Sequence, residues 1–441
     1  MNKDRTSAGK AIPTIGRAMN YLVSKSRLYW ELVILITLVL VFFEWRSIHY
    51  QLWGGRSLSP VDIVFVLGLG LIFFHVKQRK KRGSIKQTFQ AEIPIFLFSL
   101  PIVMMVLLYS NQSALINVTQ SLPRFTLVGL AIYMVMTSLV IKRIPKIDLL
   151  RYLLGCELAV ATLYLFVFIF TRLSWSTFIY GEGTPALNFP FGSPNQAALF
   201  LALNLILGIG TALTLRKYLL LYYLTPIMIV GVFQTGSRSV TALLILGLAG
   251  LQSCILLRGM LINRFPKREI AHLILSTVFA GVCLFGLLDA QGTRALSVFG
   301  YNPVEIASGK MDSYRSEAWN RAIETTSSYT DISGGIYCPS PCEAQGLHNA
   351  YLDLWLNWGV LSLASFLIFL LVMLYCSGTL AWRSRDEIDF PIHAGLLVGV
   401  VLVAAAIYGN PLLHLKFVWV FFGIIISFQF IGNMKRQDLV N

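Results

Sequence analysis

The chain alternates long apolar runs with polar connections. Runs that could cross a bilayer as helices lie near residues 28–43, 61–76, 93–109, 125–141, 152–171, 196–215, 218–233, 239–257, 270–288, 359–376, 391–408 and 416–432. A helix needs about 20 apolar residues to cross the hydrocarbon core, and several of these runs are near the lower limit. The pattern predicts an all-α integral membrane protein with about twelve transmembrane helices.

One long polar stretch interrupts this alternation. Roughly sixty residues, from 289 to 348, separate two apolar runs, whereas most other connections are far shorter. Loops of this length usually have a function. The chain is therefore divided into residues 1–288 with nine helices, a loop at 289–358, and residues 359–441 with three helices and a tail.

The loop is expected to contain short helices. Residues 312–323 have an amphipathic pattern, and Asp312 or Ser313 is placed to cap that helix. A second helix is expected to begin at His348 or Asn349.

Composition agrees with a membrane protein. The 441 residues are 56% hydrophobic and 13% charged, and the mean hydropathy is +0.68. A net charge of +15 would suit a nucleic-acid partner, but 26 of the 36 Lys and Arg residues fall on the side of the basic N-terminus. This asymmetry is a topology signal. It places both termini in the cytoplasm and the long loop outside, and it gives affinity for anionic lipid rather than nucleic acid.

The cysteines divide into two groups. Four lie inside expected spans: Cys156, Cys254, Cys283 and Cys376. The other two, Cys338 and Cys342, lie in the outward loop, where an oxidising compartment favours a disulfide over two free thiols. A zinc site would need two further ligands, and His348 is the one candidate nearby, so no metal is expected.

Three side chains are candidates for chemistry on the outer face. Arg238, beside the bilayer core, either binds an anion or extends toward water. Arg315 either faces solvent or binds an anion as well. His348 is either a general base or a hydrogen-bonded interfacial histidine. The loop shows no close pair of carboxylates like that of a glycosidase.

Four short sequence stretches contain these three candidate residues or lie near them in the pattern. They are Phe191-Gly192-Ser193-Pro194-Asn195, Thr235-Gly236-Ser237-Arg238, Ser313-Tyr314-Arg315 with Trp319, and Gly346-Leu347-His348-Asn349-Ala350-Tyr351-Leu352 with Gly359. Together they resemble the O-antigen ligase and O-antigen polymerase superfamily over roughly residues 185–375. The chain departs from the family at Ser362, where a second glycine is frequent, and this difference concerns helix packing more than chemistry.

The resemblance implies a glycosyltransferase similar to the GT-C class, located in the bacterial inner membrane with a periplasmic active site. Such enzymes move a glycan from undecaprenyl pyrophosphate to an acceptor hydroxyl with inversion, without a metal or cofactor. Arg238 and Arg315 would bind the pyrophosphate, and His348 would be the base. Asn349 would orient the histidine or the substrate. Asn195 would bind substrate, although helix capping explains it equally well.

Two glycan acceptors, and one other class of protein, remain open. A ligase delivers O-antigen to lipid A-core, and a polymerase extends another carrier-linked repeat unit. The Thr-x-x-Arg, loop Arg and His-Asn set favours the ligase. A lipid or solute transporter is the alternative class, with Glu157 as its main candidate residue. An interfacial ion pair between Glu157 and Arg151 is the simpler interpretation.

Overall fold

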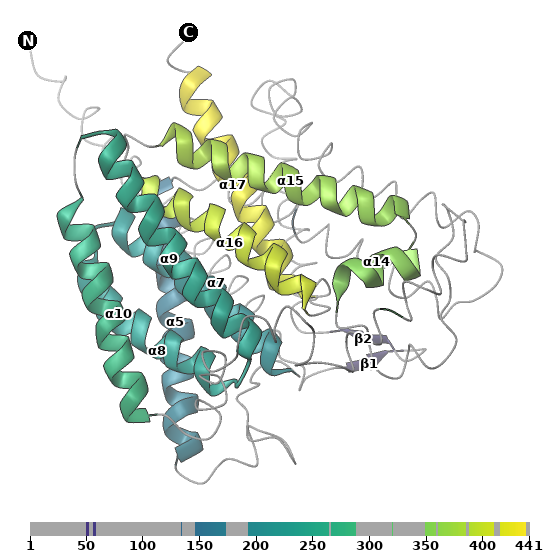
Figure 1. Ribbon diagram of the computed structural model, residues 1–441, viewed down its shortest axis with the longest axis horizontal. Helices are drawn as coiled ribbons and strands as arrows, with labels where there is room; N and C mark the ends of the chain where they lie inside the picture. The colour runs from purple at the N-terminus through teal and green to yellow at the C-terminus, as the bar shows by residue number, and fades with distance from the viewer. Residues whose placement is uncertain are drawn as a thin grey trace, which may run out of the picture. The chain divides into compact units, whose positions relative to one another are not determined.

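A computed structural model describes a part of the chain that consists mainly of helices. The described residues are 50–52, 56–58, 134, 146–172, 193–263, 266–287, 320, 349–358, 360–384, 388–409 and 415–437. The α-helices are α5 (Lys146–Arg172), α7 (Pro194–Thr214), α8 (Leu221–Gln234), α9 (Arg238–Leu261), α10 (Lys267–Leu287), α14 (Ala350–Trp358), α15 (Val360–Arg383), α16 (Phe390–Tyr408) and α17 (Lys416–Gln437) (Figure 1). A 3₁₀ turn, η1 (Tyr218–Leu220), precedes α8.

A short β-hairpin is the one departure from the all-α expectation within the described residues. Strands β1 (Tyr50–Leu52) and β2 (Arg56–Leu58) pair antiparallel, with Tyr50 opposite Leu58. The hairpin belongs to a compact unit formed by residues 1–77, and the helices belong to residues 78–441. Three-residue strands carry little hydrophobic alternation, so the sequence pattern gave no sign of them.

Eight of the expected spans coincide with helices. Six of these helices are long and apolar enough to cross a membrane, and two shorter apolar helices cover residues 218–234 and 417–429. This supports an all-α membrane protein. The expected spans at 28–43, 61–76, 93–109 and 125–141 lie outside the described residues, apart from helical Met134. Helices α5, α15 and α17 extend beyond the apolar runs because polar flanking residues can continue a helix that the apolar segment begins.

Helix α7 lies at the centre of the described helices. Every residue from Gln196 to Thr214 is buried, and α5, α8, α9 and α16 all pack against it. Its contact with α16 is close: a Cβ atom on Gly210 would stand 2.9 Å from the carbonyl oxygen of Pro391. Small residues at such contacts allow helix backbones to approach each other.

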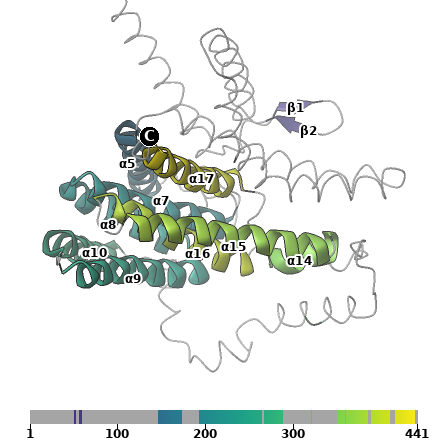
Figure 2. The same cartoon turned by 90° about the horizontal axis from the view of Figure 1, so that it is seen from above.

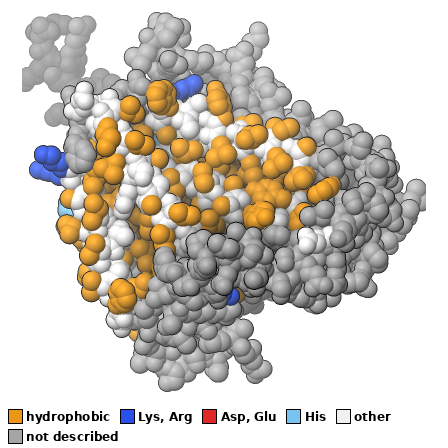
Figure 3. All heavy atoms as spheres, viewed as in Figure 1, with side chains coloured by type: hydrophobic (Ala, Val, Ile, Leu, Met, Phe, Trp, Pro, Cys, Tyr) orange, Lys and Arg blue, Asp and Glu red, His pale blue; other side chains and the backbone are white. Residues whose placement is uncertain are grey.

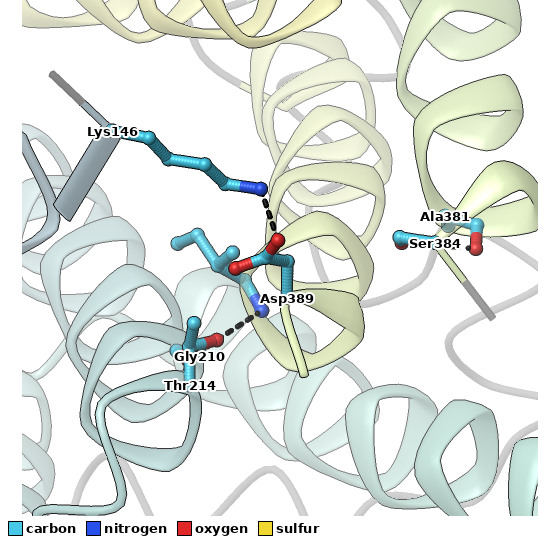
Figure 4. A network of polar contacts seen from close by, with 7 residues as sticks. Lys146, Gly210, Thr214, Ala381, Ser384 and Asp389 are labelled. Atoms are coloured by element: carbon cyan, nitrogen blue, oxygen red, sulfur yellow. Dashed lines mark hydrogen bonds and ion pairs between the residues drawn. The ribbon is translucent and has the colours of Figure 1, made fainter. Parts of the chain in front are cut away.

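The start of α16 is held by α5 and α7. Asp389 precedes α16 without capping it, and its carboxylate instead pairs with Lys146 at the start of α5 (Figure 4). The Thr214 hydroxyl of α7 accepts a hydrogen bond from the Ile392 amide at 3.2 Å. A side chain from a neighbouring helix thus satisfies one of the amides that every helix start leaves unpaired. We name this region the Asp389 end.

Helices α7 and α9 both run antiparallel to α16. Gly247, in the middle of α9, packs against Leu402 and Val398, and the guanidinium of Arg258 lies 5.1 Å from the ring centroid of Phe390. The last turn of α9 is therefore at the Asp389 end. The starts of α7 and α9 and the last turn of α16 therefore lie together at the opposite end, which we name the Arg238 end. Helices α9 and α10 lie side by side (Figure 2).

Helices α9 and α10 present an apolar surface. Their exposed large side chains are Leu246, Leu257, Met260, Leu261, Ile274, Leu275, Val278, Phe279, Val282 and Phe285. Figure 3 shows many hydrophobic side chains on the visible face of the described residues. Soluble monomers rarely expose an apolar area of this extent, whereas lipid tails would cover it.

Candidate functional site

The structure describes three of the predicted site residues. Asn195, Arg238 and Asn349 lie in or beside helices α7, α9 and α14. The other predicted residues lie outside the described part of the chain: His348, Arg315, Cys338 and Cys342. Their roles, and the disulfide, stay predictions.

Asn195 and Ser237 join the starts of α7 and α9. The Ser237 hydroxyl donates a hydrogen bond to Oδ1 of Asn195 at 2.5 Å, across 42 positions of sequence. Ser193, and not Asn195, occupies the N-cap position of α7. The capping explanation for Asn195 was therefore wrong. Its amide faces the neighbouring helix start, which only the tertiary structure could reveal.

A tight turn sets the position of Arg238. Gly236 has φ 68°, a left-handed conformation that glycine adopts without steric cost. The Thr235 hydroxyl donates to the Val232 carbonyl at 2.6 Å and accepts the Ser237 amide at 3.2 Å. The chain thus reverses between α8 and α9 within three residues, and Arg238 becomes the first residue of α9.

The local electrostatics favour an anion at the starts of α7 and α9. Neither Ser193 nor Ser237 makes a side-chain capping bond. Helix N-termini have a partial positive charge from their aligned peptide dipoles. The partly exposed guanidinium of Arg238 adds a full charge at the same place. No acidic residue lies in the first turn of either helix.

Asn349 caps α14. Its Oδ1 accepts hydrogen bonds from the amides of Tyr351 at 3.0 Å and Leu352 at 3.2 Å, and the side chain is buried. The predicted helix start at His348 or Asn349 is confirmed, since Asn is a preferred N-cap. One oxygen of Asn349 is thus used within the chain, and its proposed substrate contact stays a prediction.

Tyr351 fixes α14 to α16. Its hydroxyl donates to the Ala404 carbonyl at 2.8 Å, and its ring centroid lies 6.1 Å from that of Phe366 and 6.4 Å from that of Tyr408. Burial raises the pKa of Tyr351 to about 12, so this hydroxyl keeps its proton at neutral pH. Because Ala404 and Tyr408 belong to the last part of α16, α14 is attached at the Arg238 end. Sequence reasoning missed this tyrosine, although it lies within the quoted His-Asn stretch.

The structure thus brings the three described residues to one end of the helices. Asn195 and Arg238 meet through Ser237, and Asn349 begins a helix that is bonded to α16 at the same end. Helix α10 starts beside η1 at the Asp389 end, where the ring centroids of Tyr218 and His272 are stacked 4.8 Å apart. Helix α10 therefore runs back toward the Arg238 end. The long loop therefore connects two helices on the Arg238 side.

Glu157 does not form the ion pair with Arg151 that the sequence suggested. Arg151 lies 3.6 Å from Asp148, one turn before it. Glu157 is six residues after Arg151, on another face of α5, and neighbours on a helix are three or four residues apart. The side chain is 0% exposed. The expected interfacial ion pair was therefore wrong.

No group of three His, Cys, Asp or Glu side chains in the described residues could hold a metal ion. The thiols of Cys156, Cys254, Cys283 and Cys376 are free and lie in helices, as expected of apolar positions.

Fold and site together define the described part of the chain as an all-helical protein with six helices able to cross a membrane. Comparison with models of known protein families and with characterised proteins gives no match.

Proposed function

We propose that this chain transfers a glycan from undecaprenyl pyrophosphate to an acceptor hydroxyl at the Arg238 end, on the periplasmic face of the bacterial inner membrane. The observation that supports this most is the meeting of Asn195, Ser237 and Arg238 at the end where Asn349 begins α14. His348 directly precedes Asn349 in the sequence. Residues that are far apart in the chain thus gather where an anionic donor would bind.

The proposed chemistry is an inverting displacement. His348 takes the proton from the acceptor hydroxyl, whose oxygen attacks the anomeric carbon opposite the pyrophosphate. The bond from that carbon to the pyrophosphate oxygen breaks, and the pyrophosphate leaves with the electron pair. Arg238 and Arg315 stabilise the departing charge with forked donors. The positive ends of α7 and α9 add to this stabilisation.

The acceptor distinguishes a ligase from a polymerase. We favour ligation of O-antigen to lipid A-core in lipopolysaccharide synthesis, because the Thr-x-x-Arg, loop Arg and His-Asn set is most similar to the ligase pattern. Polymerisation of carrier-linked repeat units is the alternative. A deletion strain that lacks glycan on lipid A-core but keeps lengthened carrier glycan supports the ligase; the loss of lengthened carrier glycan supports the polymerase.

Transport of a lipid or solute is a second candidate, and the burial of Glu157 favours it. Ionisable groups within membrane helices frequently belong to ion or substrate pathways. A transporter moves its substrate unchanged and needs a gradient or ATP, whereas a transferase forms a new glycosidic bond without either.

The test uses the purified chain in liposomes with labelled carrier-linked glycan and lipid A-core acceptor. Arg238→Lys keeps the charge but loses the fork, so transfer should fall by about tenfold or more. Arg258→Lys makes the same change at the other end of α9 and is expected to leave transfer within about twofold of wild type. Equal activity of the two variants would exclude Arg238 from the site.

Two loop variants test the remaining roles in the same assay. His348→Ala should abolish transfer while the protein stays in the membrane, and retained activity would remove the base assignment. Arg315→Lys should impair transfer if pyrophosphate is bound through a fork, and wild-type turnover would count against that role.

A further inference from the structure

Glu157 is enclosed where α5, α7 and α8 meet. Its side chain is 0% exposed, and both carboxyl oxygens are buried without a hydrogen-bond partner in the described part of the chain. A Cβ atom on Gly208 of α7 would lie 3.4 Å from Cβ and Cγ of Glu157 and 3.4 Å from Leu224 of α8. The glutamate is therefore packed directly between backbone and apolar side chains.

Among the described residues, the helices packed on α5 offer no positive charge to this carboxyl. Helices α7 and α8 contain no Lys, Arg, His, Asp or Glu. Their titratable groups are Tyr222 and Tyr223 of α8. The Tyr222 hydroxyl is hydrogen-bonded to His272 at 3.1 Å, and the Tyr223 hydroxyl is hydrogen-bonded to Thr162 at 2.9 Å. Neither tyrosine donates to Glu157.

The described side chains of α5 itself do not supply a cation either. Arg151 has a side chain that is 68% exposed and pairs with Asp148. Cys156 and Tyr164 are buried and uncharged at neutral pH. Lys146, at the start of the helix, pairs with Asp389 of α16.

Neither carboxyl oxygen of Glu157 receives a hydrogen bond from the described residues, and the buried Thr225 hydroxyl of α8 has no partner there either. The oxygens of Glu157 are acceptors when ionised, and Asn204, one turn from Gly208 on α7, also has a buried Oδ1 without a partner among the described residues. An ionised carboxylate in such surroundings is strongly unfavourable, and a bound proton removes the charge and adds a donor. We infer that Glu157 is a proton-binding site and that the folded chain holds its carboxyl in the neutral form between α5, α7 and α8.

This site links the proton to the position of α7. Loss of the proton would place a negative charge against Gly208, and α5 and α7 would have to separate for water to reach it. The proton on Glu157 would stabilise the fold whether the chain transfers glycans or transports a substrate.

The experiment compares the pH dependence of unfolding for the full-length chain and Glu157→Gln in detergent micelles, from about pH 6 to about pH 9. Glutamine keeps the shape and stays neutral. The folding constant of wild type relative to the variant is expected to fall about tenfold per pH unit, because the folded state keeps one proton that the unfolded state releases. Glu269→Gln, a change at a partly exposed glutamate of α10, should follow wild type. Parallel curves for wild type and Glu157→Gln would overturn the inference.

Two further measurements keep the test decisive. Glu157→Met and Glu157→Gln should both fold, since a neutral residue of similar length replaces a neutral acid. If both failed to fold at a pH where wild type folds, a neutral side chain could not replace Glu157, and the inference would be overturned. Stabilisation of wild type by sodium over potassium at constant pH, absent in Glu157→Gln, would also overturn the inference by identifying a metal cation as the ligand.

Discussion

Replacing Gly210 with alanine should test the contact that positions α7 and α16. The added Cβ atom would stand 2.9 Å from the carbonyl oxygen of Pro391 and 3.0 Å from Cα of Ile392. These are backbone atoms, so they cannot move aside by a side-chain rotation, and the two helices must separate by a few tenths of an ångström. Overpacking of this kind costs about 1–3 kcal/mol.

The matched control is Gly281→Ala in α10. Apart from its chain neighbours and the nearby backbone of its own helix, no atom lies within 4 Å of the Cβ that this change would add. Both substitutions gain about 1 kcal/mol of helix propensity, so this contribution cancels when the two variants are compared. Gly210→Ala is therefore expected to be less stable than Gly281→Ala by about 1–3 kcal/mol, which is the steric cost alone.

Unfolding of both variants in mixed micelles, followed by the loss of helical circular dichroism, measures this difference. A stability of Gly210→Ala equal to or above that of Gly281→Ala would mean that α7 and α16 do not approach as closely as described. The antiparallel arrangement that brings the starts of α7 and α9 to one end would then lose its main support.

The remaining predictions concern single contacts. Asn349→Ala removes the cap of α14 and should cost about 1 kcal/mol, seen as faster proteolysis at that helix; unchanged proteolysis would contradict the cap. Tyr351→Phe loses the bond to the Ala404 carbonyl, about 0.5–1.5 kcal/mol. Because burial raises the pKa of Tyr351 to about 12, wild-type stability should decline above about pH 10, where the unfolded tyrosine ionises first, and this decline should be smaller in the Phe variant than in wild type. Lys146→Met leaves the carboxylate of Asp389 without its cation and should cost about 1–3 kcal/mol in the unfolding assay. Adding Asp389→Asn should recover part of that loss, and no recovery would argue against the pair.

The helices were predictable because their causes are local. Apolar runs of membrane length gave eight of the observed helices, and the asparagine before Ala350 gave the start of α14 to within a residue or two. An N-cap acts on the two or three amides that follow it, so neighbouring sequence is sufficient to recognise it. The hairpin at residues 50–58 was missed because three-residue strands are too short for a periodic pattern.

The site was predictable only as a set of separate residues. Arg238 and Asn195 were identified from the sequence, but their connection through Ser237 spans 42 positions and depends on α7 and α9 starting at the same end. Glu157 was misassigned because the nearest arginine in sequence lies on another face of the helix. Its surroundings come from Gly208 on α7, and nothing near Glu157 in the chain indicates that contact.

Which segments become helices follows from the order of residues alone, because hydrophobic length and helix capping act over short stretches of chain. Only the packing of the helices brings the helix starts together and encloses the carboxyl of Glu157. It also lets the Thr214 hydroxyl of α7 accept a hydrogen bond from the Ile392 amide at the start of α16. Those outcomes depend on the close approach of helices that are distant in sequence, where the shape of one surface must match another.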